Sequence, residues 1–210
     1  MISYNLQYEQ IGLATEKPGI LTGLLLNNLG TIIGDSIMKQ IDISTPKHPN
    51  TFALVDDADY EWLNQHKWYA DKGYDTWYAV RVVSLPNGLR RKTYMHRDIL
   101  GLKYGDKRQG DHRNHNGLHN WRDNLRICNC SQNHQNMNMN PYKNCSSEYK
   151  GVSWYKTRQK WAAEIVVKNH KIRLGYFDNE IRAAKAYDQS AVKYFGEFAC
   201  LNFPIKKESY

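Results

Sequence analysis

The segment from residue 109 to residue 136, QGDHRNHNGLHNWRDNLRICNCSQNHQN, constrains the fold and chemistry of this 210-residue chain more than any other. Asp111 and His112 precede a loop rich in asparagine and glycine, which is followed by a short apolar stretch and a helix-favouring stretch. This order predicts strand, loop, strand and helix, a path that returns Asn133 to Asp111. A carboxylate, an imidazole and an amide would then share one site.

Those side chains are the parts needed to cut a phosphodiester bond with one divalent ion. Carboxylate and amide oxygens are ligands for Mg²⁺ or Mn²⁺, whose charge stabilises the transition state and the departing oxygen. A neutral imidazole can take the proton of the attacking water near neutral pH. Adjacent side chains on an extended backbone point to opposite faces, so Asp111 can face the metal while His112 faces the water.

The end of the segment predicts a short helix. Ser131 is a good N-cap for a helix that begins near Gln132. Such a helix would carry Asn133 and Asn136 on adjacent turns of one face.

The part of the chain before this segment is predicted to be rich in short strands. Residues 51–100 contain many aromatic and β-branched residues, separated by turn signals such as Pro86-Asn-Gly88. A short helix is expected to open near Asp56, where early acidic residues suit its dipole. His96 is expected at the end of a strand. Residues 1–37 are almost uncharged, and one hypothesis is that Met38 is the natural start of the protein.

A second unit is predicted after a polar linker at 137–147. Residues 148–204 show three strand patterns and then helical spacing from Glu180 to Phe195, with Asn179 and Gly196 suited to its two ends. In the last strand, basic and apolar residues alternate at 171–174, which predicts one face for a polyanion and one for a core. The preceding strand should place Trp161, Ala163, Ile165 and Val167 on a single face.

Charge and composition favour a polyanionic partner. The chain has 29 Lys and Arg against 21 Asp and Glu, a net charge of +8. A soluble protein with a solvated cationic face is the alternative. The four cysteines form no CxxC pair, so a thiolate zinc site is disfavoured. The apolar run at 19–33 is too short for a membrane span and lacks the basic start of a signal peptide. We therefore expect a cytoplasmic protein that is neither secreted nor inserted in a membrane, and we infer no obligate protein partner.

The central segment resembles the HNH endonucleases of the phage and homing type, which use a single metal in a ββα-metal fold. The resemblance implies that Asp111 and Asn133 are metal ligands for one Mg²⁺ or Mn²⁺ ion and that His112 is the general base. It also implies that Asn124 holds the loop and so orients His112. His96 and Asn136 would support the site. The matching residues are His96-Arg97, Asp111-His112, Asn124-Leu125-Arg126, Asn133 and Asn136.

Two residues depart from this family pattern. The family usually has glycine at the position of His115 and aspartate at the position of His119. His115 is expected to strain a turn that prefers positive φ. His119 could disturb the packing of the loop or reach DNA. The departures leave the fold of the segment better supported than its activity.

Residues 148–204 resemble the plant ethylene-response-factor, or Apetala-type, DNA-binding domain. Five blocks match in order: Tyr149-Lys-Gly-Val152, Trp161-Ala-Ala-Glu-Ile165, Leu174-Gly-Tyr-Phe-Asp178, Ala183-Ala-Lys-Ala-Tyr-Asp188 and Leu201-Asn-Phe-Pro204. The resemblance implies contacts to bases and phosphates from Lys150, Ser153, Lys156, Arg158, Glu164, Lys171 and Arg173. Arginines common in plant factors are replaced here by Lys150, Ser153 and Val166, so the plant sequence preference is not transferred. Trp161, Tyr176, Phe177, Tyr187 and Phe203 are expected in the core.

The sequence thus predicts an α+β protein. Its nuclease domain would be of the ββα-metal (HNH) type, preceded by short strands, and a three-stranded antiparallel sheet packed on one helix would follow. The expected division is an extension of unknown role (1–37), an HNH endonuclease domain (38–145), a DNA-binding domain (146–205) and a tail (206–210). The leading hypothesis, which the two resemblances imply, is a metal-dependent, site-specific DNA endonuclease of the homing type. It would act on double-stranded DNA in the cytoplasm of a bacterial or phage-infected cell. The alternative is a non-enzymatic DNA-binding protein with an inactive HNH remnant, and a basic packaging protein is disfavoured.

Overall fold

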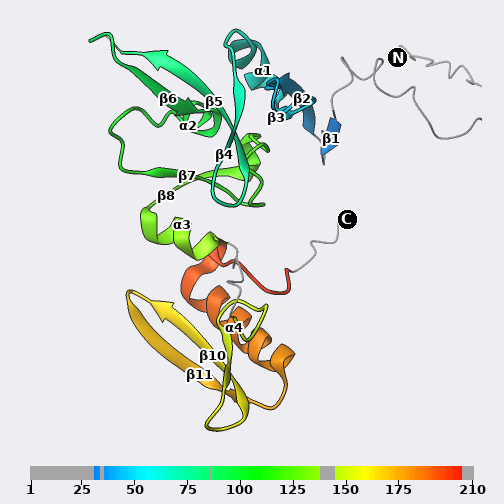
Figure 1. Ribbon diagram of the computed structural model, residues 1–210, viewed down its shortest axis with the longest axis vertical. Helices are drawn as coiled ribbons and strands as arrows, with labels where there is room; N and C mark the ends of the chain where they lie inside the picture. The colour runs from blue at the N-terminus through cyan, green and yellow to red at the C-terminus, as the bar shows by residue number, and fades with distance from the viewer. Residues whose placement is uncertain (1–30, 34–35, 86, 138–144, 205–210) are drawn as a thin grey trace, which may run out of the picture.

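The computed structural model describes residues 31–33, 36–85, 87–137 and 145–204. It is a mixed structure of several small antiparallel sheets and few helices, which agrees with the predicted α+β class (Figure 1). Most of the predicted N-terminal extension, the centre of the predicted linker and the tail lie outside the described residues.

The first sheet has the order β1-β2-β3 and is followed directly by a helix. β2 pairs antiparallel with both neighbours, and it begins at Ser36, so Met38 lies inside a strand that starts before it. Met38, Ile41 and Ile43 are buried. The elements are β1 (Thr31–Ile33), β2 (Ser36–Asp42), β3 (Phe52–Asp56) and α1 (Asp57–Asn64).

A second antiparallel sheet, β4-β5-β6, leads into a short helix that carries His96. Our expectation of His96 on a strand was wrong. The strand stops at Tyr94 because Met95 and Ile99, four residues apart, bury one helical face in the core. The elements are β4 (Tyr69–Lys72), β5 (Trp77–Ser84), β6 (Arg90–Tyr94) and α2 (Met95–Ile99).

The central segment forms two paired strands and a helix. The strands are antiparallel, with Asp111 opposite Arg126. The helix starts at Cys130, two residues earlier than predicted, because Asn129 and not Ser131 caps it. The Asn129 side chain accepts from the Gln132 backbone, and the Gln132 side chain accepts from the Asn129 backbone, each at 2.9 Å. The elements are β7 (Gln109–His112), the 3-10 helix η1 (Arg122–Asn124), β8 (Leu125–Cys128) and α3 (Cys130–Asn136).

The loop between β7 and β8 is docked onto the first two sheets. The Leu54 backbone N–H donates to Leu118 at 2.9 Å, and the Asn120 N–H donates to Leu54 at 2.7 Å. Gly117 donates to Thr76 Oγ1 at 3.0 Å. One core of buried side chains extends from the first sheet through α1, β4, β5 and α2 to Leu125 on β8. The loop and both strands therefore have a fixed support.

The C-terminal part, residues 145–204, is an antiparallel sheet of order β9-β10-β11 packed against one long helix. Asn179 caps the helix and Gly196 ends it with φ of 55°, both as predicted. The predicted face of β10 is confirmed, because Trp161, Ala163, Ile165 and Val167 all pack into the two clusters that include α4 residues. The register shift between β10 and β11 leaves Leu174 of β11 as the extra residue, so the alternation of β10 is kept. The elements are β9 (Val152–Tyr155), β10 (Lys160–Val167), β11 (His170–Phe177), α4 (Glu180–Phe195) and the 3-10 helix η2 (Gly196–Phe198).

Within the described part of the chain, no helix has the length and apolar character needed to cross a membrane.

Candidate functional site

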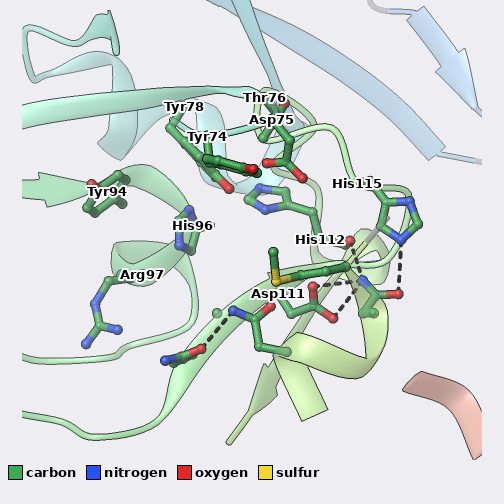
Figure 2. A pocket seen from close by; sticks show the side chains of 15 residues that line it. Tyr74, Asp75, Thr76, Tyr78, Tyr94, His96, Arg97, Asp111, His112 and His115 are labelled. Carbon is green, nitrogen blue, oxygen red and sulfur yellow. Dashed lines mark hydrogen bonds between the residues drawn. The ribbon is translucent and has the colours of Figure 1, made fainter. Parts of the chain in front are cut away.

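Asp111, His112 and Asn133 line one pocket of about 470 Å³. Figure 2 shows its labelled walls: Tyr74, Asp75, Thr76 and Tyr78 lie on one side, and His96 faces the centre from α2. His115 and Asn136 also line it. The segment from 109 to 136 therefore folds back on itself as predicted.

Hydrogen bonds from two sides hold the Asp111 carboxylate. Arg126 on the opposite strand donates from Nε to Asp111 Oδ2 at 2.7 Å, and both side chains are buried. Asn136 on α3 donates from Nδ2 to both carboxylate oxygens, at 2.9 and 3.1 Å, and to the backbone oxygen of His112 at 3.1 Å (Figure 2). Asn136 thus ties the helix to the strand that carries the two key residues.

The His112 ring is buried and oriented by Asn120. His112 Nε2 lies 3.2 Å from Asn120 Oδ1, and Asn120 Nδ2 faces the Gly117 backbone oxygen at 3.4 Å. Because the amide oxygen accepts, the neutral imidazole carries its proton on Nε2 and keeps its lone pair on Nδ1. Burial lowers the pKa of His112 to about 4, against the opposing effects of the Asn120 contact and the Asp111 charge. The ring is therefore a neutral proton acceptor at neutral pH.

His96 packs against His112 inside the same pocket. The two ring centroids are 4.8 Å apart in an edge-on arrangement. Burial, followed by the nearby His112 ring, holds the pKa of His96 well below its usual value. Gly110 makes this approach possible, because a Cβ atom there would lie 2.6 Å from His96 Cδ2. His96 thus supports the His112 ring from the side.

Asp111 and Asn133 fit a divalent ion that keeps part of its water shell. Asn133 donates from Nδ2 to Gln109 Oε1 at 2.7 Å, which leaves its Oδ1 as the atom able to bind a cation. An ionised carboxylate has about four acceptor positions, so Asp111 retains room for an ion. Among the described residues, no group of three or more His, Cys, Asp and Glu side chains could hold a metal. Two oxygen ligands supplemented by water and phosphate suit Mg²⁺ or Mn²⁺ better than zinc.

Asn124 holds the ends of the loop together but does not contact the His112 ring. It donates to the His119 backbone oxygen at 2.7 Å and to Asn114 Oδ1 at 3.0 Å, and it accepts from the Asn114 backbone at 3.1 Å. The direct contact to His112 comes from Asn120. Asn124 therefore acts on the ring only through the shape of the loop.

The two residues that depart from the family pattern have distinct environments. His115 has φ of 63°, the positive value that its position was expected to impose. Its Nε2 lies 3.1 Å from Asn136 Oδ1, so the ring is joined to the group that holds Asp111. His119 lies between the side-chain amides of Asn114 and Asn116, at 2.8 and 3.0 Å, and packs on Trp121.

The outer face of the C-terminal sheet gathers cationic and aromatic side chains. Glu164 pairs with Lys171 at 2.9 Å and with Arg173, its neighbour across the strands. Arg158 and Arg173 lie over the ring of Tyr176, which is therefore part of this face and not of the core as expected. Ser153, Lys156, Arg158, Lys171 and Arg173 are exposed, and Tyr155 is exposed beside them.

Lys150 does not belong to this face. Its ammonium donates to the backbone oxygens of Gln135 and Met137, at 2.8 and 2.7 Å, at the end of α3. Burial lowers its pKa. The Lys150 ammonium is thus used inside the protein, and its contact with DNA stays a prediction.

Sequence reasoning gave no role to three residues that shape the site: Gln109, Asn120 and Arg126. Asn120 stands among several loop asparagines, and no spacing distinguishes it from Asn114 or Asn116. The sequence did contain a signal for Arg126. If the two predicted strands pair antiparallel with Asp111 opposite Arg126, the opposite charges of these side chains lie next to each other.

The comparisons with known proteins fall into two groups, and no family model matches the chain. It is 42% identical over 60 residues to an AP2-like ethylene-responsive transcription factor of Arabidopsis thaliana, covering 29% of this chain and 12% of that protein. It is 46% identical over 69 residues to dehydration-responsive element-binding protein 2D of the same plant, covering 32% and 33%. The chain thus spans a third or less of these plant relatives.

A longer match extends over most of the chain. An uncharacterized HNH endonuclease of Acanthamoeba polyphaga mimivirus is 32% identical over 156 residues, which cover 72% of this chain and 75% of the viral protein. The chain belongs to the HNH endonuclease family. Within that family, this member also shares a stretch of about 60 residues with the plant factors.

Proposed function

We propose that this HNH family member is a metal-dependent, site-specific DNA endonuclease of the homing type that hydrolyses phosphodiester bonds. The observation that carries the proposal is the buried, neutral His112 ring, which Asn120 orients in the same pocket as the Asp111 carboxylate. A proton acceptor and an oxygen ligand set with this arrangement suit phosphodiester hydrolysis. The order β7, β8 and α3 supports a ββα-metal arrangement for the site.

In this proposal, Asp111 and Asn133 hold one Mg²⁺ or Mn²⁺ ion, which supplies positive charge for the scissile phosphate. His112 accepts the proton of the attacking water on Nδ1. Asn120 keeps Nε2 protonated, so that the basic nitrogen is available to the water. His96 excludes bulk water from the far side of the His112 ring, and Asn136 with Arg126 keeps the carboxylate in place.

Double-stranded DNA is the proposed substrate, bound by the outer face of the C-terminal sheet. Support comes from its exposed cationic side chains, with aromatic rings beside them, and from the likeness to plant factors named as transcription factor or element-binding protein. Cationic side chains neutralise phosphates and give binding that weakens with salt. Lys156, Arg158, Lys171 and Arg173 are the proposed phosphate contacts, with Ser153 and Glu164 beside the bases.

The test is an assay of cleavage and binding on the same purified protein. Plasmid or phage DNA is incubated with the protein in Mg²⁺ or Mn²⁺, and binding to the same DNA is measured in EDTA. The proposal expects nicked or linear products that depend on the ion. Binding without any cleavage in either ion would reject the enzyme and leave a DNA-binding protein.

That second function, a DNA-binding protein with an inactive site, has one observation in its favour. Both oxygens of Asp111 already accept hydrogen bonds from Arg126 and Asn136. If these contacts excluded a cation, the pocket would be a stable remnant. The cleavage assay separates the two functions directly, and a measurement of Mn²⁺ binding shows whether the carboxylate is still accessible.

A further inference from the structure

The Arg126 side chain connects the nuclease pocket to the C-terminal part of the chain. From its Nε it donates to Asp111 Oδ2 at 2.7 Å, and from Nη1 it donates to the backbone oxygen of Glu197 on η2. Its guanidinium lies over the Phe198 ring, 4.0 Å from the centroid. The Arg126 side chain is only 7% exposed. One buried cation thus contacts the Asp111 carboxylate and the turn after α4.

Further contacts join the same two parts of the protein. Arg113, one residue after His112, pairs with the Glu197 carboxylate at 2.8 Å. On the other side, the Lys150 ammonium donates to the backbone oxygens of Gln135 and Met137 at the C-terminal end of α3. The helix dipole favours a cation at this end. In Figure 1, α3 lies against the segment that follows α4. The C-terminal part therefore contacts both the strand and the helix of the site.

A buried guanidinium needs this second set of partners. Its five N–H groups cost free energy if they are buried without acceptors, and one carboxylate cannot satisfy all of them. The Glu197 oxygen takes an additional donor, and the Phe198 ring covers the guanidinium plane. Without this cover, the long side chain would be free to leave Asp111 for water. The position of Arg126 therefore depends on η2.

We infer that Glu197 and Phe198 are positioning residues of the nuclease centre: by holding Arg126 against Asp111, they fix the carboxylate that binds the ion. The C-terminal part then completes the cutting site in addition to binding DNA. This inference rests on the proposed function, because it concerns the same carboxylate. It predicts that a change in η2, outside the pocket, alters ion binding and cleavage.

The experiment compares Phe198→Leu with Phe198→Tyr in the full chain. Leucine keeps an apolar side chain but removes the aromatic face, whereas tyrosine keeps the face. The Arg126 Nε–H signal is followed by ¹⁵N NMR, and Mn²⁺ affinity is measured without DNA. Phe198→Leu should increase the solvent exchange of that N–H about tenfold and weaken Mn²⁺ binding several-fold. Phe198→Tyr should stay close to the wild type in both measurements.

Phe203→Leu is the matched control, since Phe203 packs on Tyr149 in the same part of the chain, whereas Arg126 lies over the ring of Phe198. It should leave the Arg126 signal and Mn²⁺ affinity unchanged. DNA binding in EDTA should stay within about twofold for all three variants. Equal behaviour of Phe198→Leu and Phe198→Tyr, or an unchanged Arg126 signal in both, would overturn the inference.

A second comparison decides the matter if Phe198→Leu does not fold. Arg126→Lys keeps the positive charge but loses Nε–H and the planar group. It should weaken Mn²⁺ binding, because the Asp111 carboxylate loses the Nε–H donor that η2 holds in place. If Arg126→Lys binds Mn²⁺ as the wild type does, the inference is wrong. Absence of cleavage by the wild type would reject the proposed function alone, because the NMR and Mn²⁺ measurements do not require turnover.

Discussion

His112 and His96 lie side by side, buried, and the surroundings of both favour the neutral form. The pKa of His112 falls from 6.5 to about 4 on folding, so the unfolded chain binds more protons between these values. Its contribution to stability is complete above pH 6.5 and is lost as the pH falls toward 4. At about 1.4 kcal/mol per pKa unit, the loss by pH 4 is about 3 kcal/mol.

This dependence can be measured by urea unfolding in EDTA at pH 7, 6 and 5. We expect wild-type stability to decrease by about 2 kcal/mol from pH 7 to pH 5 through His112 alone. His112→Asn removes the titrating ring, so its stability should change less over the same range, whatever its stability at pH 7. Parallel curves for the two proteins would show that His112 is not held neutral by burial.

His115 makes a separate prediction at the scale of one residue. Its φ of 63° is costly for a residue with a Cβ atom, by about 1 kcal/mol, while its ring contacts Asn136. His115→Gly and His115→Ala both remove the ring, but only glycine relieves the backbone. Thermal or urea unfolding should therefore find the glycine variant more stable by about 1 kcal/mol. Equal stability of the two variants would mean that the turn is unstrained.

At the scale of elements, the β7–β8 loop is the part that the pocket depends on most. Gly117 packs so closely on the second sheet that a Cβ atom would lie 2.4 Å from the backbone oxygen of Trp77. A backbone group cannot move aside as a flexible side chain can. The loop also carries Asn120, the partner of the His112 ring. A shift of this loop should therefore move Asn120 and change the orientation of the His112 ring.

Gly117→Ala should lower stability by about 1–3 kcal/mol and should also reduce cleavage. Gly101→Ala is the control, because Gly101 has φ of 67° and open space around its Cβ position. Gly101→Ala should lower the free energy of unfolding by about 1 kcal/mol, and it should leave the cleavage rate per folded molecule unchanged. The comparison needs unfolding curves and cleavage rates for both. Unchanged cleavage by a folded Gly117→Ala variant would show that the loop tolerates the shift.

Sequence patterns predicted element types better than element ends. Helical spacing, the Asn179 cap and Gly196 predicted α4 with its correct limits. The start of α3 was wrong because Asn129 and Ser131 are both good caps, and only the reciprocal contact with Gln132 selects Asn129. His96 was placed on a strand because the burial of Met95 and Ile99 on one helical face depends on tertiary packing.

At the scale of the whole molecule, the two parts of the chain could be recognised separately, but their contact could not. Motif spacing predicted that Asp111, His112 and Asn133 share one site, and in the structure all three line one pocket. The contact between Lys150 and the end of α3 was not predicted, because it joins two parts of the chain that have separate sequence patterns. Contacts between residues far apart in sequence, such as Arg126 with Glu197, leave no local pattern.

The outer sheet face makes a prediction about DNA binding. Arg173→Gln should weaken binding and lower the dependence of log K on log salt by about one unit if one phosphate contact is lost. Lys185→Gln is the matched control, since Lys185 is an exposed cation on α4, the helix packed against this sheet. It should leave the salt slope nearly unchanged. Binding is measured over a range of salt concentrations in EDTA, and equal slopes for the two variants would argue against the sheet face.

The central claim is that His112 is the proton acceptor of a DNA-cutting site. The most direct measurement compares wild type with His112→Ala in single-turnover cleavage with Mg²⁺ or Mn²⁺ and in DNA binding with EDTA. The account predicts that the variant cleaves at least about 100-fold more slowly and binds DNA within about twofold of the wild type. Cleavage at the wild-type rate, or an equal loss of binding and cleavage, would contradict it.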